Sequence, residues 1–237
     1  SFNIGGILWY QGCNDAQAGR FEQYYSRFKS VVEDYRRVFG NDDDLPFIYA
    51  QLAPYKNSRP EYEYGLYQRF QIIREIQRLM LDDEDVNKNL GMVVSLDAVY
   101  DTPADMIHPL GKDILGKRFA EVYKAMRDDT GAVVSGPLYE SAAVEGSAVR
   151  ISFKENTADG LQILNPDYSY EQDGSGRADS TVLDEFEIAG ADGEYYPAEA
   201  EIDGDTVIVS SEKVSAPKYV RYAYSERPEN ANLANGA

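Results

Sequence analysis

The sequence predicts an α/β domain with a parallel sheet, followed by a domain of antiparallel β-strands. Within residues 1–130, short apolar runs alternate with longer amphipathic segments, whereas residues 131–237 hold short alternating runs separated by turn residues. Charge changes at the same place, with 16 basic and 21 acidic residues before it and 7 basic and 20 acidic residues after it. We therefore expect two domains, residues 1–130 and 131–237.

The first domain begins with a short apolar strand. Ile7 to Tyr10 is an apolar run that follows two glycines and stops at Gln11, and we expect it to be buried on both faces. Apolar residues then recur at intervals of three and four from Phe21 to Phe39. This spacing predicts an amphipathic helix, and Gly40 stands where a glycine commonly ends one.

Two more strands and two more helices complete the α/β pattern. We expect strands at residues 46–52 and 90–96, and helices at residues 66–80 and 110–126. Strands that alternate with helices in this way are usually parallel and joined by right-handed crossovers.

Polar residues follow each of these strands. They occupy Gln11 to Asp15, Gln51 to Tyr55, and Asp97 to His108. Ligands bind outside the carboxyl ends of the strands in open parallel sheets. The three loops therefore predict one functional edge.

The second half is predicted to be an antiparallel, sandwich-like β region. We expect strands at residues 149–153, 186–188, 206–209 and 219–223, with a hairpin turn at Asp203–Asp205 and a polar loop at residues 172–177. Its many acidic side chains are typical of a solvated face.

Composition excludes several functional classes. A net charge of −18 argues against nucleic acid or an anionic membrane surface as a partner. One cysteine and one histidine exclude a disulfide framework and a Cys/His zinc site, and we expect no metal or cofactor. No apolar run reaches the length of a membrane span. The chain starts at Ser1, so a preceding segment is expected, and both cytoplasmic and secreted or periplasmic locations stay open.

The single histidine, His108, is the strongest candidate for chemistry. Imidazole is the side chain whose ordinary pKa lies nearest physiological pH. Asp105, three residues upstream, is placed to hold its other ring nitrogen. A surface histidine without chemistry is the alternative, but the predicted loop convergence favours a general base.

The sequence resembles sialate O-acetylesterase-like enzymes of the SGNH hydrolase superfamily. Five segments carry the resemblance: Gly6–Gly12, Leu45–Tyr55, Arg74–Gln77, Asp105–Pro109, and the β region around Phe186–Asp192 and Asn232–Leu233. The resemblance implies a three-layer αβα sheet of flavodoxin-like type, present here in part.

It also implies hydrolysis of an acetyl ester on a sugar or glycan by a serine nucleophile. His108 would take and return the proton, and Asp105 would orient the imidazole. The turn after the first strand would stabilise the oxyanion through Gln11, Gly12 and Asn14. Gln51 and Tyr55 are further candidates in the substrate loop. A structural alternative for the turn is that Asn14 and Asp15 cap the next helix.

Two positions depart from the family pattern. The family usually has Glu after the turn glycine, whereas this chain has Cys13, which shifts the role of the acid onto Asp105. Cys13 is interpreted as a small buried side chain rather than as a nucleophile. No serine here has the family's nucleophile context, and Ser175 lacks a following helix. We therefore expect the nucleophile to lie outside this chain, which by itself should turn over little substrate.

An apolar strand edge at Ile7–Tyr10 should not stay open, because unpaired edges promote aggregation. We expect a missing N-terminal segment or a second chain to cover it, and a homo-oligomer is one way to do so.

Two other functions stay open. One is a non-catalytic carbohydrate-binding or structural module, in which Tyr55, Tyr62, Tyr64 and Tyr67 stack on sugars or merely pack. The other is an esterase for acetylated xylan or pectin.

Overall fold

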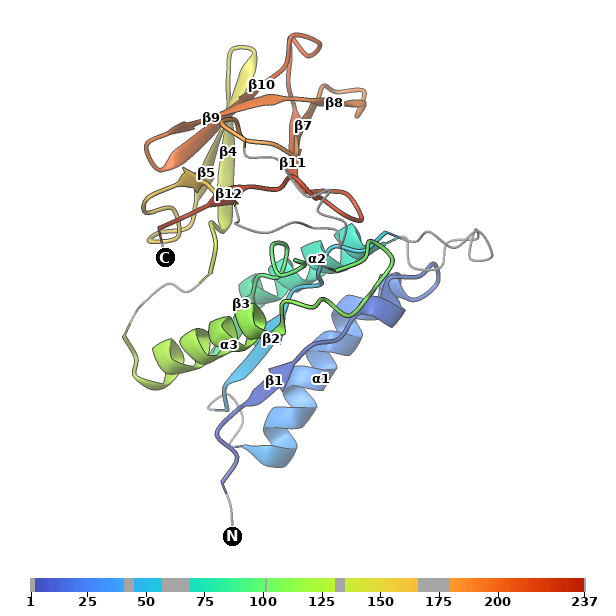
Figure 1. The fold of residues 1–237 in the computed structure, drawn as a ribbon, viewed down its shortest axis with the longest axis vertical. Helices are drawn as coiled ribbons and strands as arrows, with labels where there is room; N and C mark the ends of the chain where they lie inside the picture. Colours follow the sequence, from blue (N-terminus) through green and yellow to red (C-terminus); the bar gives the residue numbers. More distant parts are fainter. Residues whose placement is uncertain are drawn as a thin grey trace. The chain divides into compact units, whose positions relative to one another are not determined.

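The computed structural model describes residues 3–40, 45–56, 69–100, 102–130, 135–165 and 180–236. They form two compact units (Figure 1), each described by itself below. The first unit holds residues 1–134 together with the short segment Ser225–Arg227. The division at residue 130 stays a prediction, and it did not anticipate that Ser225–Arg227 groups with the α/β unit.

A three-stranded parallel sheet organises the first unit. Its strands are β1 (Ile7–Trp9), β2 (Phe47–Ala50) and β3 (Leu90–Val93), in the order β1-β2-β3. Leu8 pairs with Ile48, and Ile48 pairs with Gly91, in parallel register. The predicted α/β fold class with parallel strands is confirmed.

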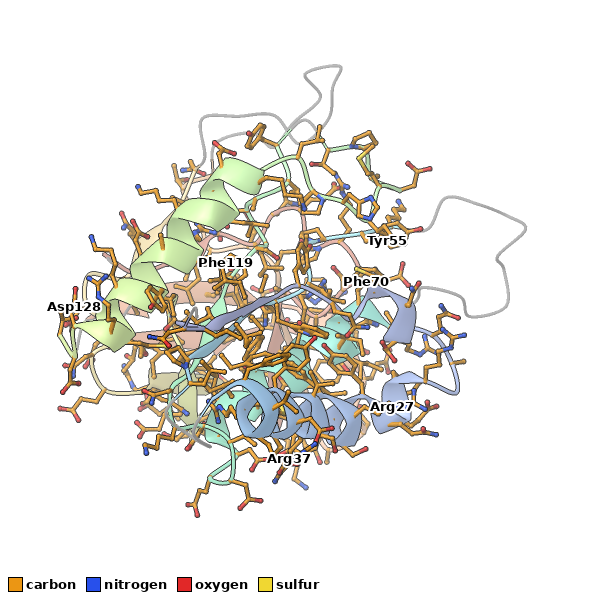
Figure 2. The ribbon with its side chains drawn as sticks, turned by 90° about the horizontal axis from the view of Figure 1, so that it is seen from below. Arg27, Arg37, Tyr55, Phe70, Phe119 and Asp128 are labelled. Atoms are coloured by element: carbon orange, nitrogen blue, oxygen red, sulfur yellow. The ribbon has the colours of Figure 1, made fainter. Side chains whose placement is uncertain are left out.

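Helices cover both faces of this sheet. They are α1 (Tyr24–Phe39), α2 (Phe70–Leu79) and α3 (Lys112–Arg127), with short 3₁₀ helices η1 (Cys13–Asp15), η2 (Phe21–Gln23) and η5 (Met80–Asp82). Figure 2 shows α1 on one side of the sheet and α3, which carries the labelled Phe119, on the other. Residues 66–68 of the second predicted helix lie outside the described residues.

The two faces of the sheet are packed differently. On the α1 face, the rings of Phe28 and Tyr49 meet edge to face with centroids 5.0 Å apart. On the α3 face, aliphatic residues of β2 and β3 pack against Leu115 and Val122. A Cβ on Gly91 would lie only 2.6 Å from Val122 Cγ1, so this glycine lets α3 approach the sheet closely.

One local expectation was wrong. The first strand is not buried on both faces, since Leu8 is 61% exposed. The physical reason is that β1 is the outer strand among the described residues, while α3 packs on β2 and β3. Gly40 ends α1 as predicted, although its backbone there is extended rather than left-handed. A Cβ there would lie 2.6 Å from Leu45 Cβ, so close packing explains the glycine.

The amino-terminal edge of the sheet is held by a buried arginine. Arg36 of α1 is 2% exposed. Its guanidinium donates to the carbonyls of Leu45, Val86 and Lys88 at 3.3, 2.8 and 2.6 Å. These carbonyls precede β2 and β3, so Arg36 satisfies buried acceptors at the end of the sheet away from the polar loops.

The second unit consists of antiparallel sheets, as predicted. A four-stranded sheet has the order β4-β5-β10-β9, a three-stranded sheet has the order β11-β7-β8, and β12 pairs with β6. Their bounds are β4 Tyr139–Glu145, β5 Ala148–Phe153, β6 Gln162–Ile163, β7 Phe186–Ala189, β8 Tyr195–Pro197, β9 Glu199–Asp203, β10 Thr206–Ser210, β11 Tyr219–Tyr222 and β12 Leu233–Ala234.

One apolar core joins the two larger sheets of this unit. Ile151 and Val207 of one sheet pack in the same buried cluster as Phe186 and Ile188 of the other. This is the sandwich-like arrangement that the alternating pattern predicted. The expected hairpin turn joins β9 to β10, with Gly204 at φ +65°. The polar loop at 172–177 lies outside the described residues.

Candidate functional site

The loops that follow β1, β2 and β3 contact one another at the carboxyl edge of the sheet. The main-chain N–H of Ala53 donates to Tyr10 Oη at 3.4 Å, which joins the first loop to the second. The main-chain N–H of Lys56 donates to the carbonyl of Ala104 at 2.8 Å, which joins the second loop to the third. The convergence predicted from the positions of the loops is present in the fold.

A buried glutamine of α2 forms hydrogen bonds to both of the first two loops. Gln77 is fully buried, and its Nε2 lies within hydrogen-bond distance of the Gln11 carbonyl at 3.3 Å and of Tyr24 Oη at 3.2 Å. Its Oε1 accepts the N–H of Leu52 at 2.9 Å. One side chain therefore holds the ends of β1 and β2 at a fixed separation, and sequence reasoning did not identify it.

The turn after β1 has a backbone that requires glycine. Gly12 has φ +136°, and a Cβ there would lie 3.0 Å from both Ile73 Cγ2 and Tyr24 Oη. Gln11 Nε2 donates to Asp15 Oδ2 at 2.6 Å, so its amide is engaged inside the turn. Asn14 is exposed. The turn is thus firmly shaped, while the oxyanion role of Gln11, Gly12 and Asn14 stays a prediction.

The helix-capping interpretation of this turn was wrong. Helix α1 begins only at Tyr24, after η2, and Gln23 precedes it without a side-chain cap. Asp15 instead accepts the amide of Gln11 and lies 3.7 Å from Arg27 Nη1. The carboxylate therefore closes the turn on itself and does not cap a distant helix.

Cys13 lies in the same turn, half-buried. Burial raises the pKa of its thiol to about 11, although the nearby Lys112 ammonium lowers it. The nucleophilic form of cysteine is the thiolate. Because the thiol stays protonated at neutral pH, its environment opposes nucleophilic catalysis.

Lys112, the first residue of α3, connects the first loop to the third. Its ammonium lies 5.1 Å from the centroid of the Tyr10 ring, a cation–π contact. Desolvation lowers the pKa of Lys112. Burial raises the pKa of Tyr10 well above its ordinary value. Neither residue was singled out from the sequence, because only the fold brings them together.

Asp105 and His108 lie in the third loop, just before α3. Asp105 is half-buried and His108 is exposed, so the imidazole is accessible from solvent. Pro109 is buried next to it, and Gly111 precedes the helix. His108 thus lies in the loop after β3, which is one of the three loops at the carboxyl edge. Its role as the base, and that of Asp105 as its partner, stay predictions.

The loop after β2 supplies the two other predicted residues, both of which make contacts within the α/β unit, and their role toward substrate stays a prediction. Gln51 Nε2 donates to the Arg74 carbonyl at 3.2 Å. Tyr55 is 5% exposed and its ring stacks on Phe70 with centroids 4.8 Å apart; Figure 2 labels both residues. A sugar could reach this face of Tyr55 only by displacing Phe70. Tyr62, Tyr64 and Tyr67 lie outside the described residues.

A segment distant in sequence also belongs to this edge. Arg74 Nη1 donates to the Glu226 carbonyl at 3.3 Å, and Nη2 donates to the carbonyl of Ser225. The N–H of Tyr55 donates to the same Glu226 carbonyl at 3.1 Å. Burial raises the pKa of the Glu226 carboxyl, opposed by nearby cations that include Arg69 and Arg74.

Within the described ranges, no group of three or more His, Cys, Asp and Glu side chains is placed to hold a metal ion. In the same part of the chain, no helix has the length and apolar character needed to cross a membrane.

The fold and its loop edge define an α/β protein of the kind that binds ligands at the carboxyl ends of parallel strands. Residues 1–125 match the family model described as carbohydrate esterase, sialic acid-specific acetylesterase. The match covers more than half of the chain, and the chain belongs to this family. The predicted resemblance is confirmed.

A solved structure supports the same assignment over nearly the whole chain. The crystal structure of a carbohydrate acetylesterase from Xanthomonas citri is 31% identical in sequence, with a TM-score of 0.80. The alignment covers 99% of this chain and 48% of that one, so the chain spans about half the length of the solved enzyme. None of the curated proteins compared with the chain matches it.

Proposed function

We propose that this chain is the part of a carbohydrate O-acetylesterase that carries the catalytic base and the acid that orients it. The family match over residues 1–125 is the observation that carries the proposal. It is supported by the position of His108, which is exposed in the loop after β3, where Ala104 of the same loop accepts the N–H of Lys56 from the loop after β2.

The proposed reaction is acyl transfer through a serine supplied from outside this chain. The serine Oγ attacks the acetyl carbonyl while His108 takes the hydroxyl proton, and the oxyanion forms in reach of the turn at Gln11–Asn14. The carbonyl re-forms as the sugar oxygen leaves with the proton from His108. Water then attacks the acetyl-serine by the same route, releasing acetate and restoring the serine. Asp105 orients the imidazole and stabilises its cation.

The outer edge of β1 is the proposed place for the remaining part of the enzyme. Leu8, on the face that it shares with Ile48, is 61% exposed. A strand paired there, from an N-terminal segment or a second copy, would cover this apolar edge and satisfy its backbone groups. Such a strand could bring the serine to the same carboxyl edge as His108.

The proposed substrate is a 9-O-acetylated sialic acid, in line with the family description, with acetylated xylan and acetylated pectin as the other candidates. The test measures acetate release from these three substrates by the full-length protein and by this chain alone. We expect release by the full-length protein, fastest from the sialate ester, and little release by the chain alone.

Two results would contradict this proposal. Binding of acetylated sugar by the full-length protein without any acetate release would indicate a binding module. Rapid turnover by this chain alone would show that it holds its own nucleophile and would bring Cys13 back into consideration.

A further inference from the structure

We propose that Thr102 is a positioning residue that holds the loop carrying Asp105 and His108 in its working shape. The inference rests on the proposed function, since it gives that loop a catalytic task. Thr102 is fully buried and lies three residues before Asp105 in the loop. It has no chemistry of its own in the proposed reaction.

The hydroxyl of Thr102 closes the loop. Its Oγ1 accepts the main-chain N–H of Leu110 at 2.9 Å, across eight positions of sequence. The same hydroxyl donates to the Tyr100 carbonyl at 3.2 Å. One side chain thus bridges the segment entering the loop and the segment leaving it toward α3, with Asp105 and His108 between them.

Thr102, whose hydroxyl bonds to Leu110 and Tyr100 form what we call the Thr102 clasp, is itself held by further contacts in the α/β unit. The N–H of Thr102 donates to the Val99 carbonyl at 3.0 Å. Its carbonyl accepts from Arg227 Nη2 at 3.5 Å, in the segment that Arg74 also holds. At the far end of the loop, a Cβ on Gly111 would lie 2.4 Å from the Ala98 carbonyl oxygen, so α3 starts in close contact with the first part of the loop after β3.

Within the loop, few main-chain bonds hold the residues between the two clasped ends. Met106 N–H donates to the Pro103 carbonyl at 3.0 Å, and Ala104 accepts from Lys56. His108 itself is exposed. An exposed base on a loop keeps its geometry only if the ends of the loop are fixed, and a displacement of about 1 Å can cost roughly 100-fold in rate.

The test compares Thr102→Val with Thr102→Ser in the full-length protein, using acetate release from the acetylated sugar. Valine keeps the shape of threonine but removes the hydroxyl, while serine keeps the hydroxyl. We expect Thr102→Val to lower kcat by about 10- to 100-fold with KM within about twofold, because substrate contacts are not touched. Thr102→Ser should restore kcat to within a few-fold of the parent protein.

Thr157 provides a matched control in the β unit. It is 4% exposed, its Oγ1 accepts the N–H of Leu138 at 3.1 Å, and it donates to the Lys154 carbonyl at 2.8 Å. Thr157→Val therefore removes the same kind of buried clasp away from the His108 loop. We expect its kcat to stay unchanged. If Thr102→Val does not fold, Thr102→Ala serves as the second variant.

The outcomes separate the two claims. If the parent protein releases acetate and His108→Ala does not, yet Thr102→Val and Thr102→Ala keep the parent kcat, the role of Thr102 is overturned alone. An equal loss in Thr102→Ser and Thr102→Val would also overturn it, since the hydroxyl would then not matter. If the parent protein releases no acetate, the proposed function itself fails.

Discussion

At the residue scale, His108 and Cys13 both lie in loops at the carboxyl edge of the parallel sheet, but they differ in their exposure to solvent. His108 is exposed before α3, whereas Cys13 is half-buried in the turn after β1. Burial penalises the charged thiolate and keeps the thiol protonated. The environment therefore separates an accessible imidazole from a thiol that burial keeps protonated, while the roles of both residues stay predictions.

The titration of Cys13 gives a prediction about its reactivity. With a pKa of about 11 in place of its ordinary 9.0, the thiolate fraction at pH 7.5 falls, by about 100-fold. We expect iodoacetamide to alkylate Cys13 slowly in the folded chain and at the ordinary rate in urea. The folded rate should rise as pH approaches 11, because deprotonation forms the nucleophile. A fast rate at pH 7.5 in the folded chain would show that the thiol is activated.

At the element scale, glycines and buried polar side chains set how the helices approach the sheet. The absence of a side chain at Gly91 lets α3 pack closely on β3, and the absence of one at Gly111 lets α3 begin beside the Ala98 carbonyl. Gln77 joins the ends of β1 and β2, while Arg36 satisfies carbonyls at the opposite edge. One end of the sheet thus carries the loops of the candidate site, and the other is closed by a structural network.

Two glycines near the start of α3 allow a matched stability test. Gly111→Ala would place a Cβ 2.4 Å from a backbone oxygen, whereas nothing lies within 4 Å of a Cβ on Gly116. We expect Gly111→Ala to destabilise by about 1–3 kcal/mol through overpacking. Gly116→Ala should stabilise by about 0.5–1 kcal/mol through helix propensity.

Urea unfolding followed by tryptophan fluorescence provides the measurement. Trp9 is the single tryptophan, and its ring packs against Tyr35 and Phe47 in the α/β unit. The signal therefore reports on the unit that contains both glycines. Equal shifts of the unfolding midpoint for the two variants would contradict the close contact at Gly111.

The helices and strands were largely predictable from the sequence, whereas the contacts between side chains of different elements were not. Periodicity located β2, β3 and α1 because the pattern of apolar residues depends on local geometry. The exposure of Leu8 depends on which strand lies at the edge, and no local pattern carries that information. Gln77 contacts Gln11, which is distant in sequence, and Thr102 binds Leu110 eight positions away without a recognisable motif, so both contacts became visible only in the fold.

The candidate site shows the same division. His108 and the three loops could be found from the sequence, because strand ends in a parallel sheet share an edge. The surroundings of Tyr55 could not be found in this way, because its stacking on Phe70 depends on the fold; its contact with a sugar stays a prediction. Lys112 and Tyr10 were missed because an ammonium over a ring leaves no motif.

At the scale of the whole molecule, the chain combines an α/β unit of a carbohydrate esterase family with an antiparallel β unit. It spans about half the length of the solved acetylesterase that it resembles over 99% of its own length. The proposed account divides the reaction between this chain, which supplies His108 and Asp105, and a further segment, which supplies the serine. The exposed edge of β1 is where the two parts would join.

The most direct test of this account is the rate of p-nitrophenyl acetate hydrolysis by the full-length protein and its His108→Ala variant. Met106→Ala is the matched control, because Met106 lies in the same loop, is 37% exposed and cannot titrate. We predict that kcat/KM falls by at least about 1,000-fold in His108→Ala and stays within about twofold in Met106→Ala. Equal rates for the parent protein and His108→Ala would remove His108 from the mechanism and contradict the account.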